Sequence, residues 1–532
     1  MTNQSAPQLK SSYDAVIVGS GHNGLVAAAY LAKAGRSVLV LEQNDYIGGA
    51  TASQQLFPDY DAWISRYAYL ISLLPRQIVD ELGLQFTTRR RQIASFTPYS
   101  DSNGNSNGLV ISNIDEQRSR DSMFELSGNH QEWAGFQRLQ ELEKSIAEVV
   151  WPSLLEPLKS RADFRRSLQS DQQREAWESF VERPLGEVVE RVVQNDLVRG
   201  LVFTDAKIGV FTYPLDPSLI QNRCFLYHVI GNGTGEWQVP VGGMRALVDS
   251  LVATCRAAGV EFLTQATAQH VELGDSYRMV TFQHQGRQLS AGARDVLINA
   301  GPRTFAKLMG TKWQPIATDE GSVVKVNMLL RRLPKLKATG LSLEEAFCGS
   351  FHIDEGYGQM QQSFAKAESR QIPDPIPCEM YCHTLTDPSI LSPELQRAGH
   401  HTLTLFALDM PYRLFADNHD ERREQVKRLL LDGLERVCAE SFVDCLARDA
   451  SGNLCLEIKT PQDLEREIGL DLGNIFHSSL SWFFTDEPDA VGTWGVETEF
   501  SRVYRAGSSA LRGGAVSGIP GRNAAMCILS KE

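Results

Sequence analysis

Residues 13–43 read YDAVIVGSGHNGLVAAAYLAKAGRSVLVLEQ, and this stretch decides the fold. The apolar run at 15–18 predicts a buried strand, and residues 25–34 have helix-forming composition. Three glycines between them, in residues 19–24, are spaced as G-x-G-x-x-G. A second apolar run at 37–41 predicts another strand, and Glu42 stands at its end. The stretch therefore predicts a strand, a tight turn, a helix and a strand that ends in an acid.

Each residue of this turn has a separate physical reason. Gly19 allows the tight turn, Gly21 lets the backbone approach a pyrophosphate, and Gly24 lets the helix pack against the strand. The helix N-terminus offers free N–H groups and partial positive charge to the phosphates. Glu42 follows Gly24 by 18 residues and can accept both ribose hydroxyls. The unit predicts a dinucleotide-binding site.

Composition limits the remaining classes of function. At 532 residues and 59.1 kDa, the chain is longer than one hydrophobic core usually supports, so we expect two domains. A net charge of −13 argues against a nucleic-acid partner. The basic run Arg89-Arg90-Arg91 is interpreted as a solvated loop, with contact to an anionic lipid as the alternative. Nine thinly spread cysteines indicate free thiols in a reducing compartment, and no metal site is predicted. We expect a cytoplasmic protein, with peripheral membrane contact left open.

The rest of the chain predicts how the dinucleotide-binding pattern is completed. Residues 136–149 carry an apolar helical stripe that ends near Pro152. A helix is predicted over 244–258, and DVLINAG (295–301) predicts a strand. Near the C-terminus, VYRAG (503–507) predicts a short strand, and the stretch from about 516 to 529 predicts a helix.

Two features favour FAD over NAD. Gly48-Gly49-Ala50 follows Glu42 closely, where a two-glycine turn brings further N–H groups to the pyrophosphate. GNGTGE (231–236) lacks the spacing and the following helix of a second dinucleotide motif. No C-x-x-x-x-C redox pair is present, so electrons are expected to leave to a diffusible acceptor, oxygen or a quinone.

Five stretches give a more specific resemblance: VGSGHNGLVAAAYLAKAG, VLEQNDYIGGA, VPVGGMRAL, GNIFHSSLS (473–481) and GGAVSGIPGRNAA (513–525). In this order they resemble phytoene-desaturase-like FAD enzymes. The chain is most similar to the branch that contains phytoene-dehydrogenase-related proteins named for pyridine nucleotide-disulfide oxidoreductases, with carotenoid ketolases as relatives. The resemblance implies an α/β Rossmann-type FAD-binding domain of the amine-oxidase and phytoene-desaturase kind, with an inserted α+β substrate domain.

The resemblance also implies domain limits and cofactor contacts. It gives a discontinuous FAD domain over 12–95, 236–310 and 470–532, and a substrate domain over 96–235 and 311–469. The residues implied to contact the pyrophosphate are Gly19, Ser20, Gly21, His22, Asn23 and Gly24, and those at the ribose are Glu42 and its neighbour Gln43. Gly48, Gly49 and Ala50 are implied on the flavin side, and Ala268 at the adenine. The residues implied near the ribityl chain and flavin ring are Gly507, Ala515, Val516 and Ser517. The replacement of a family histidine-proline-glycine by Leu511-Arg512-Gly513 is expected close to the flavin face.

The implied activity is desaturation of a long apolar isoprenoid or carotenoid-like substrate, with hydride passing to flavin N5. His477 is the candidate catalytic residue, because a histidine exchanges protons near neutral pH; the alternative is a loop histidine beside the cofactor. The segments SRYAYLISLL, GVFTYPL and SLSWFFTDEP are candidate walls of an apolar tunnel or ordinary core. Two other functions stay open: oxygenation of a polyene, as in carotenoid ketolases, and a flavin-binding regulatory protein without turnover.

Overall fold

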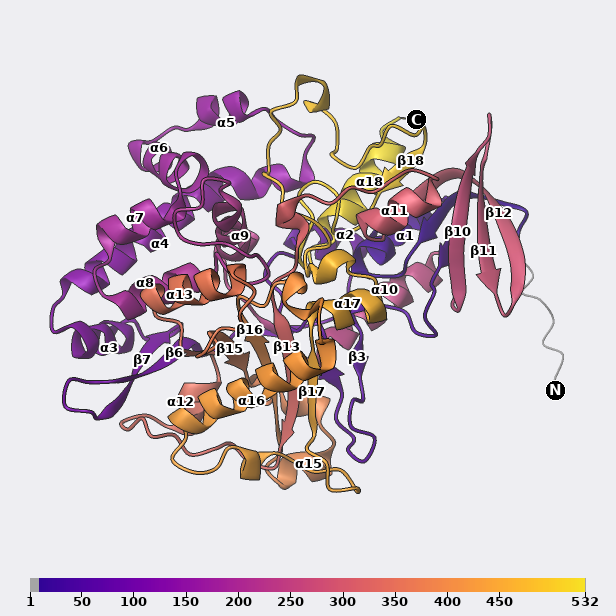
Figure 1. Cartoon of the computed structure of the whole chain (residues 1–532). Helices are drawn as coiled ribbons and strands as arrows, with labels where there is room; N and C mark the ends of the chain where they lie inside the picture. Colours follow the sequence, from indigo (N-terminus) through magenta and orange to yellow (C-terminus); the bar gives the residue numbers. More distant parts are fainter. Residues whose placement is uncertain (1–8, 532) are drawn as a thin grey trace.

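Two large sheets organise the protein in this computed structural model, which describes residues 9–531. The first is a seven-stranded sheet in the order β10-β11-β12-β1-β2-β9, with β18 paired to β12. Its strands are β1 (Ser12–Val18), β2 (Val38–Leu41), β9 (Glu261–Leu263), β10 (Ala266–Leu273), β11 (Arg278–His284), β12 (Arg287–Ile298) and β18 (Val503–Arg505). It is parallel around β1, and β10–β12 form an antiparallel extension that Figure 1 shows at the right-hand side.

The predicted N-terminal unit is confirmed. Helix α1 (His22–Lys33) connects β1 to β2, and Gly35 follows it with φ of +82°. The four residues of β2 and the alanines at 27–29 are all buried, because Val38 and Val40 pack on the side of α1 whereas Leu39 and Leu41 pack in a second core with residues of β10–β12. A continuous apolar strand of this kind is typical of a parallel sheet that is covered on both faces.

Two more helices pack against α1. These are α10 (Met244–Ala257) and α18 (Ile519–Leu529), which confirm the helices predicted over 244–258 and near the C-terminus. Pro520 lies in the first turn of α18, where a missing N–H is harmless. Figure 1 shows the yellow α18 beside the indigo α1, so the two ends of the sequence share one layer.

The second sheet is formed mainly by later parts of the chain. Its seven strands run in the order β17-β13-β16-β15-β14-β6-β7. Their bounds are β6 (Ile93–Ser100), β7 (Ser106–Ser112), β13 (Val324–Leu330), β14 (Ser350–Ile353), β15 (Cys378–Tyr381), β16 (His401–Ala407) and β17 (Leu456–Lys459). Strand β6 begins at Ile93 and so crosses the predicted domain limit between residues 95 and 96. On the solvent side, α16 (His419–Val437) contributes Val426, Leu430 and Leu434 to the core of this sheet.

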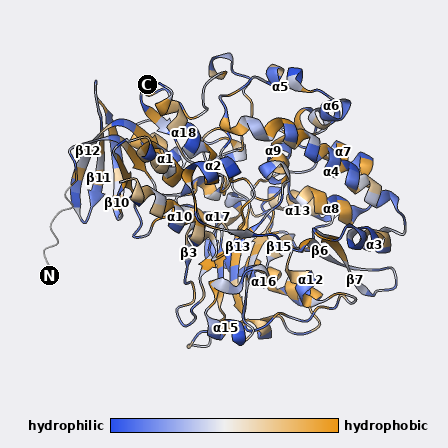
Figure 2. Cartoon of the chain, turned by 180° about the vertical axis from the view of Figure 1, so that it is seen from behind, coloured by the Kyte–Doolittle hydropathy of each residue, from blue (hydrophilic) through white to orange (hydrophobic). Residues whose placement is uncertain are grey.

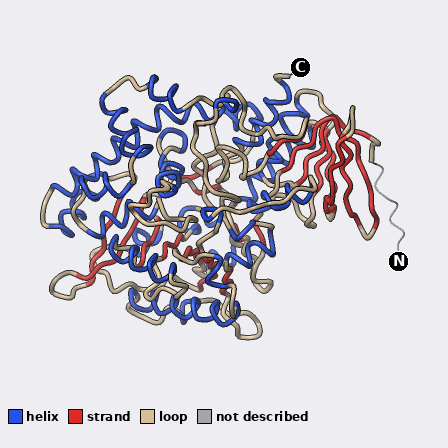
Figure 3. Tube along the Cα trace, turned by 45° about the horizontal axis from the view of Figure 1, so that its top comes forward, coloured by secondary structure: helices blue, strands red, loops and turns tan. Residues whose placement is uncertain are grey.

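A helical layer lies beside the second sheet. It consists of α3 (Glu116–Ser127), α4 (Gln131–Val150), α5 (Arg161–Ser167), α6 (Asp171–Trp177), α7 (Leu185–Val192), α8 (Asp196–Thr204) and α9 (Ile220–Val229). The predicted stripe lies on α4, where Leu139, Leu142 and Ile146 are fully buried. Figures 1 and 3 show these helices grouped on the side of the molecule opposite β10–β12. Figure 2 shows that helices such as α4 and α7 carry both apolar and polar residues. No helix in residues 9–531 is long and apolar enough to cross a bilayer.

Candidate functional site

Two glycines at the junction of β1 and α1, Gly19 and Gly24, have no room for a side chain. Gly19 has φ of +97°, and a Cβ atom there would lie 2.4 Å from the carbonyl oxygen of Asn299. A Cβ on Gly24 would lie 2.4 Å from the oxygen of Gly19. Helix α1 begins without a side-chain cap. The N–H groups of its first turn therefore face the loop without a capping side chain to accept their hydrogen bonds. This cradle fits a pyrophosphate group.

Glu42 lies at the end of β2 and contacts the same loop. One carboxylate oxygen accepts hydrogen bonds from the N–H of Ser20 (3.0 Å) and its hydroxyl (2.6 Å). The other oxygen accepts one from the N–H of Asn44 (2.9 Å). The Gly48 N–H donates to the Ser20 hydroxyl at 3.3 Å, so the second glycine pair lies against the first loop. Gln43 is exposed beside Glu42, and the ribose role of both stays a prediction.

The C-terminal loop meets this cradle from the other side. The Nε2 atom of His22 lies 3.0 Å from the carbonyl oxygen of Ala515, and the side-chain amide of Asn23 donates to the Ser508 hydroxyl at 3.2 Å. A Cβ on Gly507 would lie 2.9 Å from Oδ1 of Asn299. Segments almost 500 residues apart in the chain therefore form one surface.

Asn299 is a residue of this surface that the sequence did not single out. Its side-chain amide donates to the carbonyl oxygens of Gly19 (3.0 Å) and Gly21 (3.3 Å), and so fixes the loop. It directly follows β12, as the small residues at the end of DVLINAG would have allowed us to predict. Ala268 lies on the edge strand β10, at an irregularity in its pairing with β11, and its adenine contact stays a prediction.

A cavity of about 560 Å³ opens beside the loops described above. Its size is within the range of about 300–1,000 Å³ that is common for small-molecule sites. Residues from the predicted cofactor segments line it, namely His22, Ala50, Ala515 and Val516, together with His477. Apolar side chains from both regions complete the wall, including Tyr67, Tyr69, Leu70, Ile208, Phe225, Phe406, Ile475 and Phe476.

The three candidate wall segments have different positions. Tyr67, Tyr69 and Leu70 line the cavity, as predicted. Phe483 and Phe484 instead pack with Phe164 and Trp177 in the helical core, which confirms the alternative that they are ordinary core. In GVFTYPL, neither aromatic residue lines the cavity, because Phe211 and Tyr213 both pack on Phe364, with ring centres at 4.5 Å and 5.1 Å.

His477 is in the cavity wall with an unusual backbone. Its φ is +70°, and its Nδ1 atom has no hydrogen-bond partner. Burial lowers the pKa of His477 to about 4. Burial likewise lowers the pKa of His22 to about 4, and His477 contributes to that shift. Both imidazoles are therefore neutral at pH 7 and can accept a proton only weakly.

Lys325 is a second cavity residue that the sequence did not single out. Its side chain is fully buried in the middle of β13, where its ammonium nitrogen donates to the Tyr67 carbonyl at 2.9 Å. The nitrogen also lies 4.1 Å from the ring centre of Tyr69 and 4.5 Å from that of Phe406. Burial lowers the pKa of Lys325 well below its ordinary value. The sequence feature that could have identified this residue is the position of a lysine within the apolar run VVKVNMLL.

Carboxyl groups occupy another part of the cavity wall. Glu379 accepts a hydrogen bond from the Tyr381 hydroxyl at 2.6 Å, and burial raises the pKa of Glu379 to about 8. Burial, with the charge of Asp205 nearby, raises the pKa of Glu143 to about 8. His352 forms a 2.6 Å contact with Glu355. The cavity is thus less apolar than the sequence predicted.

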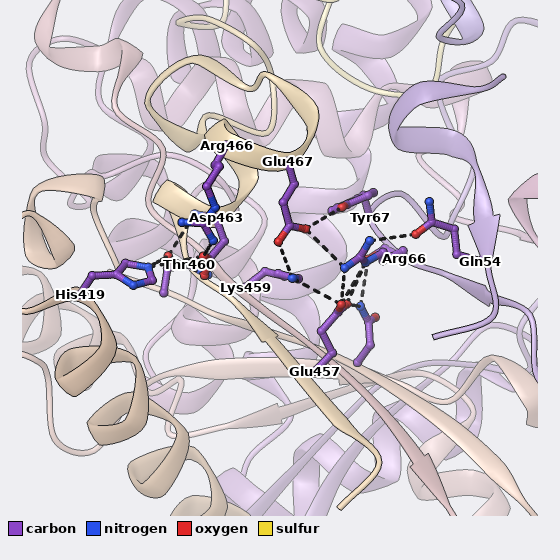
Figure 4. A network of polar contacts seen from close by, with 11 residues as sticks. Gln54, Arg66, Tyr67, His419, Glu457, Lys459, Thr460, Asp463, Arg466 and Glu467 are labelled. Carbon is purple, nitrogen blue, oxygen red and sulfur yellow. Dashed lines mark hydrogen bonds and ion pairs between the residues drawn. The ribbon is translucent and has the colours of Figure 1, made fainter. Parts of the chain in front are cut away.

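A polar network fixes the segment that carries Tyr67. The Nε atom of Arg66 donates to Glu457 on β17 at 3.0 Å, and the Tyr67 hydroxyl donates to Glu467 at 3.2 Å. Lys459 contacts Glu467 at 2.6 Å. Figure 4 shows these side chains meeting between the N-terminal segment and the second sheet. Because the charges are paired and partly buried, the network holds the cavity wall in place.

Arg512 fixes the C-terminal loop from outside the cavity. Its guanidinium donates to the carbonyl oxygens of Ser153 (3.0 Å), Glu156 (2.6 Å) and Trp494 (2.8 Å). Burial lowers the pKa of Arg512 to about 10. Arg512 is not among the residues that line the main cavity, and its side chain holds the C-terminal loop; its position relative to the flavin face stays a prediction.

Comparison with known proteins agrees with the Rossmann-like arrangement of β1, α1 and β2. A model of the NAD(P)-binding Rossmann-like domain matches residues 17–74. An uncharacterized protein of Mycobacterium tuberculosis is 41% identical over 526 residues, covering 97% of both chains. The rat pyridine nucleotide-disulfide oxidoreductase domain-containing protein 2 is 30% identical over 564 residues, covering 97% of this chain and 93% of its own.

Solved structures share the fold at low sequence identity. A redesigned putrescine oxidase superposes with a TM-score of 0.57 at 16% identity, covering 98% of this chain and 99% of its own. Cyclohexylamine oxidase from Brevibacterium oxydans gives 0.54 at 15% identity, with the same coverage. The fold is therefore a mixed α/β fold with a Rossmann-like NAD(P)-binding domain, and it is shared with putrescine oxidase and cyclohexylamine oxidase.

Proposed function

Because the chain belongs to the family of pyridine nucleotide-disulfide oxidoreductase domain-containing protein 2, we propose that it is an FAD-dependent oxidoreductase acting on a long, mainly apolar substrate. The observation that carries this proposal is the cavity that adjoins the glycine cradle. His22, Ala50 and Ala515 of the predicted cofactor segments share its wall with Tyr69 and Phe406. A substrate in this cavity would lie next to the cofactor.

The cofactor assignment is supported by the cradle itself. The loop at Gly19–Gly24, the turn at Gly48 and Gly49 and the C-terminal loop would hold FAD in three places, and Glu42 would hold its ribose. When bound, FAD supplies the acceptor for the two electrons that leave the substrate. The protein's own part is to bind and orient the substrate, exclude water, and receive a proton.

Lys325 is the best-placed group to receive that proton. Burial lowers the pKa of Lys325 well below its ordinary value and so favours the neutral amine, which can act as a base. Because Ala68 donates to the Ala50 carbonyl at 3.1 Å, the Tyr67–Tyr69 segment that contacts Lys325 adjoins the predicted flavin side. His477 is the weaker base, because its pKa of about 4 keeps its proton affinity low.

Desaturation of an isoprenoid or carotenoid-like chain is the reaction that we propose. The test is anaerobic mixing of the flavin-loaded protein with polyenes and their saturated counterparts, with loss of flavin absorbance as the readout. Reduction by the more saturated partner, with a new double bond in the product, is expected. A parallel reaction is run aerobically under labelled O2; if its product contains an oxygen atom from that O2, oxygenation of the ketolase type replaces desaturation. If no lipophilic compound reduces the flavin, the proposal of turnover is wrong and a regulatory flavoprotein remains.

A further inference from the structure

The three consecutive arginines at 89–91 have three different environments. Arg89 donates to the Thr386 carbonyl at 3.0 Å and lies 3.7 Å from Asp387. Arg90 forms a 2.9 Å ion pair with Glu236 at the rim of the cavity. Arg91 turns inward and is only 8% exposed. The run is therefore more than a solvated loop.

Arg91 lines the cavity without a carboxylate partner. Its Nε donates to the Trp237 carbonyl at 3.3 Å, and one terminal nitrogen donates to the Ser350 hydroxyl at 3.2 Å. The guanidinium lies 5.6 Å from the ring centre of Tyr381. Over the described residues 9–531, no carboxylate forms an ion pair with Arg91. A buried charge is expensive unless it is paired, so a missing counter-ion on a cavity wall points to a ligand.

None of the carboxyl groups that line the cavity within residues 9–531 forms an ion pair with Arg91, and burial disfavours the charged form of three of them. Burial raises the pKa values of Glu143 and Glu379 to about 8, so both are mainly protonated at pH 7. Burial also raises the pKa of Asp205, against the opposing effects of His228, His352 and Arg91. Protonated carboxyl groups can donate hydrogen bonds to an anion, and the planar guanidinium of an arginine offers N–H donors in a geometry that matches a carboxylate.

We infer that the substrate carries a carboxylate that pairs with Arg91, while its apolar body lies along Tyr69 and Phe406 toward Ala50. This inference rests on the proposed function and names the substrate class. One planar guanidinium matches one carboxylate in charge and in shape. A pure hydrocarbon of the carotene kind would leave Arg91 desolvated and unpaired. The cavity therefore selects an amphipathic acid with a long apolar chain.

The experiment compares one acid with its neutral ester. Binding of cis-parinaric acid, a polyene carboxylate with its own fluorescence, is measured on the purified protein with its bound cofactor, alongside the methyl ester. We expect the acid to bind about tenfold or more tightly than the ester, which is the effect of roughly one charge-assisted hydrogen bond. Arg91→Gln should bring the two affinities together. Arg91→Lys should keep part of the difference, and Arg89→Gln, outside the cavity, should leave it unchanged.

Two results would overturn the inference. Equal binding of acid and ester to the wild-type protein is one, and an unchanged preference for the acid in Arg91→Gln is the other. If Arg91→Gln does not fold, because it loses the contacts with Trp237 and Ser350, the wild-type ratio and the Lys variant decide. The readout is independent of turnover: acid-selective binding without flavin reduction contradicts the proposed function alone, and flavin reduction by neutral polyenes without acid selectivity contradicts this inference alone.

Discussion

Replacing Gly521 by alanine should separate the two helices on which the proposed cofactor site depends. Gly521 lies in α18, where a Cβ would be 2.0 Å from the carbonyl oxygen of Asn23 and 3.2 Å from the N–H nitrogen of Ala27 on α1. The shorter contact is 1.0 Å closer than the 3.0 Å that real Cβ atoms respect. Both contacted atoms are backbone, so no side chain can rotate away and α18 must move.

The stability change has two opposing parts. Alanine gains about 1 kcal/mol over glycine inside a helix. Overpacking of a closely packed contact costs about 1–3 kcal/mol, and a clash with backbone belongs at the upper end of that range. We therefore expect a net destabilisation of about 1–2 kcal/mol. Because α18 carries the loop that contacts His22 and Asn23, flavin occupancy should fall as well.

Gly433→Ala is the matched control. Gly433 is also a buried helical glycine, in α16, but the atoms nearest to its added Cβ are side-chain atoms of Arg436 and Asp354 at 3.6 Å and 3.8 Å. This variant should gain up to about 1 kcal/mol and keep its cofactor. Thermal unfolding and the ratio of flavin to protein absorbance are measured for both. If Gly521→Ala matches the wild type in both quantities, the close helix contact does not support the site.

Other changes should separate the roles of individual residues. Glu42→Gln should lower flavin occupancy, because it removes the charge that accepts two hydrogen bonds from Ser20; an unchanged absorbance ratio would contradict this. Lys325→Met should slow substrate-dependent flavin reduction by about 10²-fold or more at full occupancy, and an unchanged rate in rapid mixing would remove its role as a base. Truncation after Arg512 should abolish flavin binding, whereas loss of the last three residues should leave an unchanged spectrum. The stability of the protein should decrease from pH 6.5 toward pH 4. The pKa of His477 is about 4 in the folded protein and 6.5 ordinarily, so the unfolded chain binds more protons in this range. His477→Gln should therefore reduce the slope of Tm against pH, and an equal slope in this variant would refute the assignment.

Local sequence patterns predicted the elements of the first sheet well. The strand, turn and helix at 13–43 depend on contacts between close neighbours in sequence, and their bounds agree within a few residues. The same holds for β18 and α18, where Gly518 and Pro520 mark the helix start. The predicted domain limits stay a prediction, and β6 crosses one of them because Ser95 pairs with Ser350, 255 residues further along the chain.

The cavity could be predicted only in part. Tyr69 was identified from its neighbours in sequence, but Lys325 and Arg91 enter the wall from segments whose positions depend on tertiary packing. In GVFTYPL the alternation that suggested a wall was satisfied by packing of Phe211 on Phe364 instead. Period and composition show that a side chain is buried, and they do not show whether it faces core or cavity.

The cofactor that the purified protein carries is the decisive test of the FAD assignment. We expect a yellow protein with absorbance near ~450 nm, as a bound flavin requires. Heat denaturation should release a compound with the mass of FAD, in a ratio near one per chain in the wild type. A colourless protein that retains or binds NAD in its place would contradict the account.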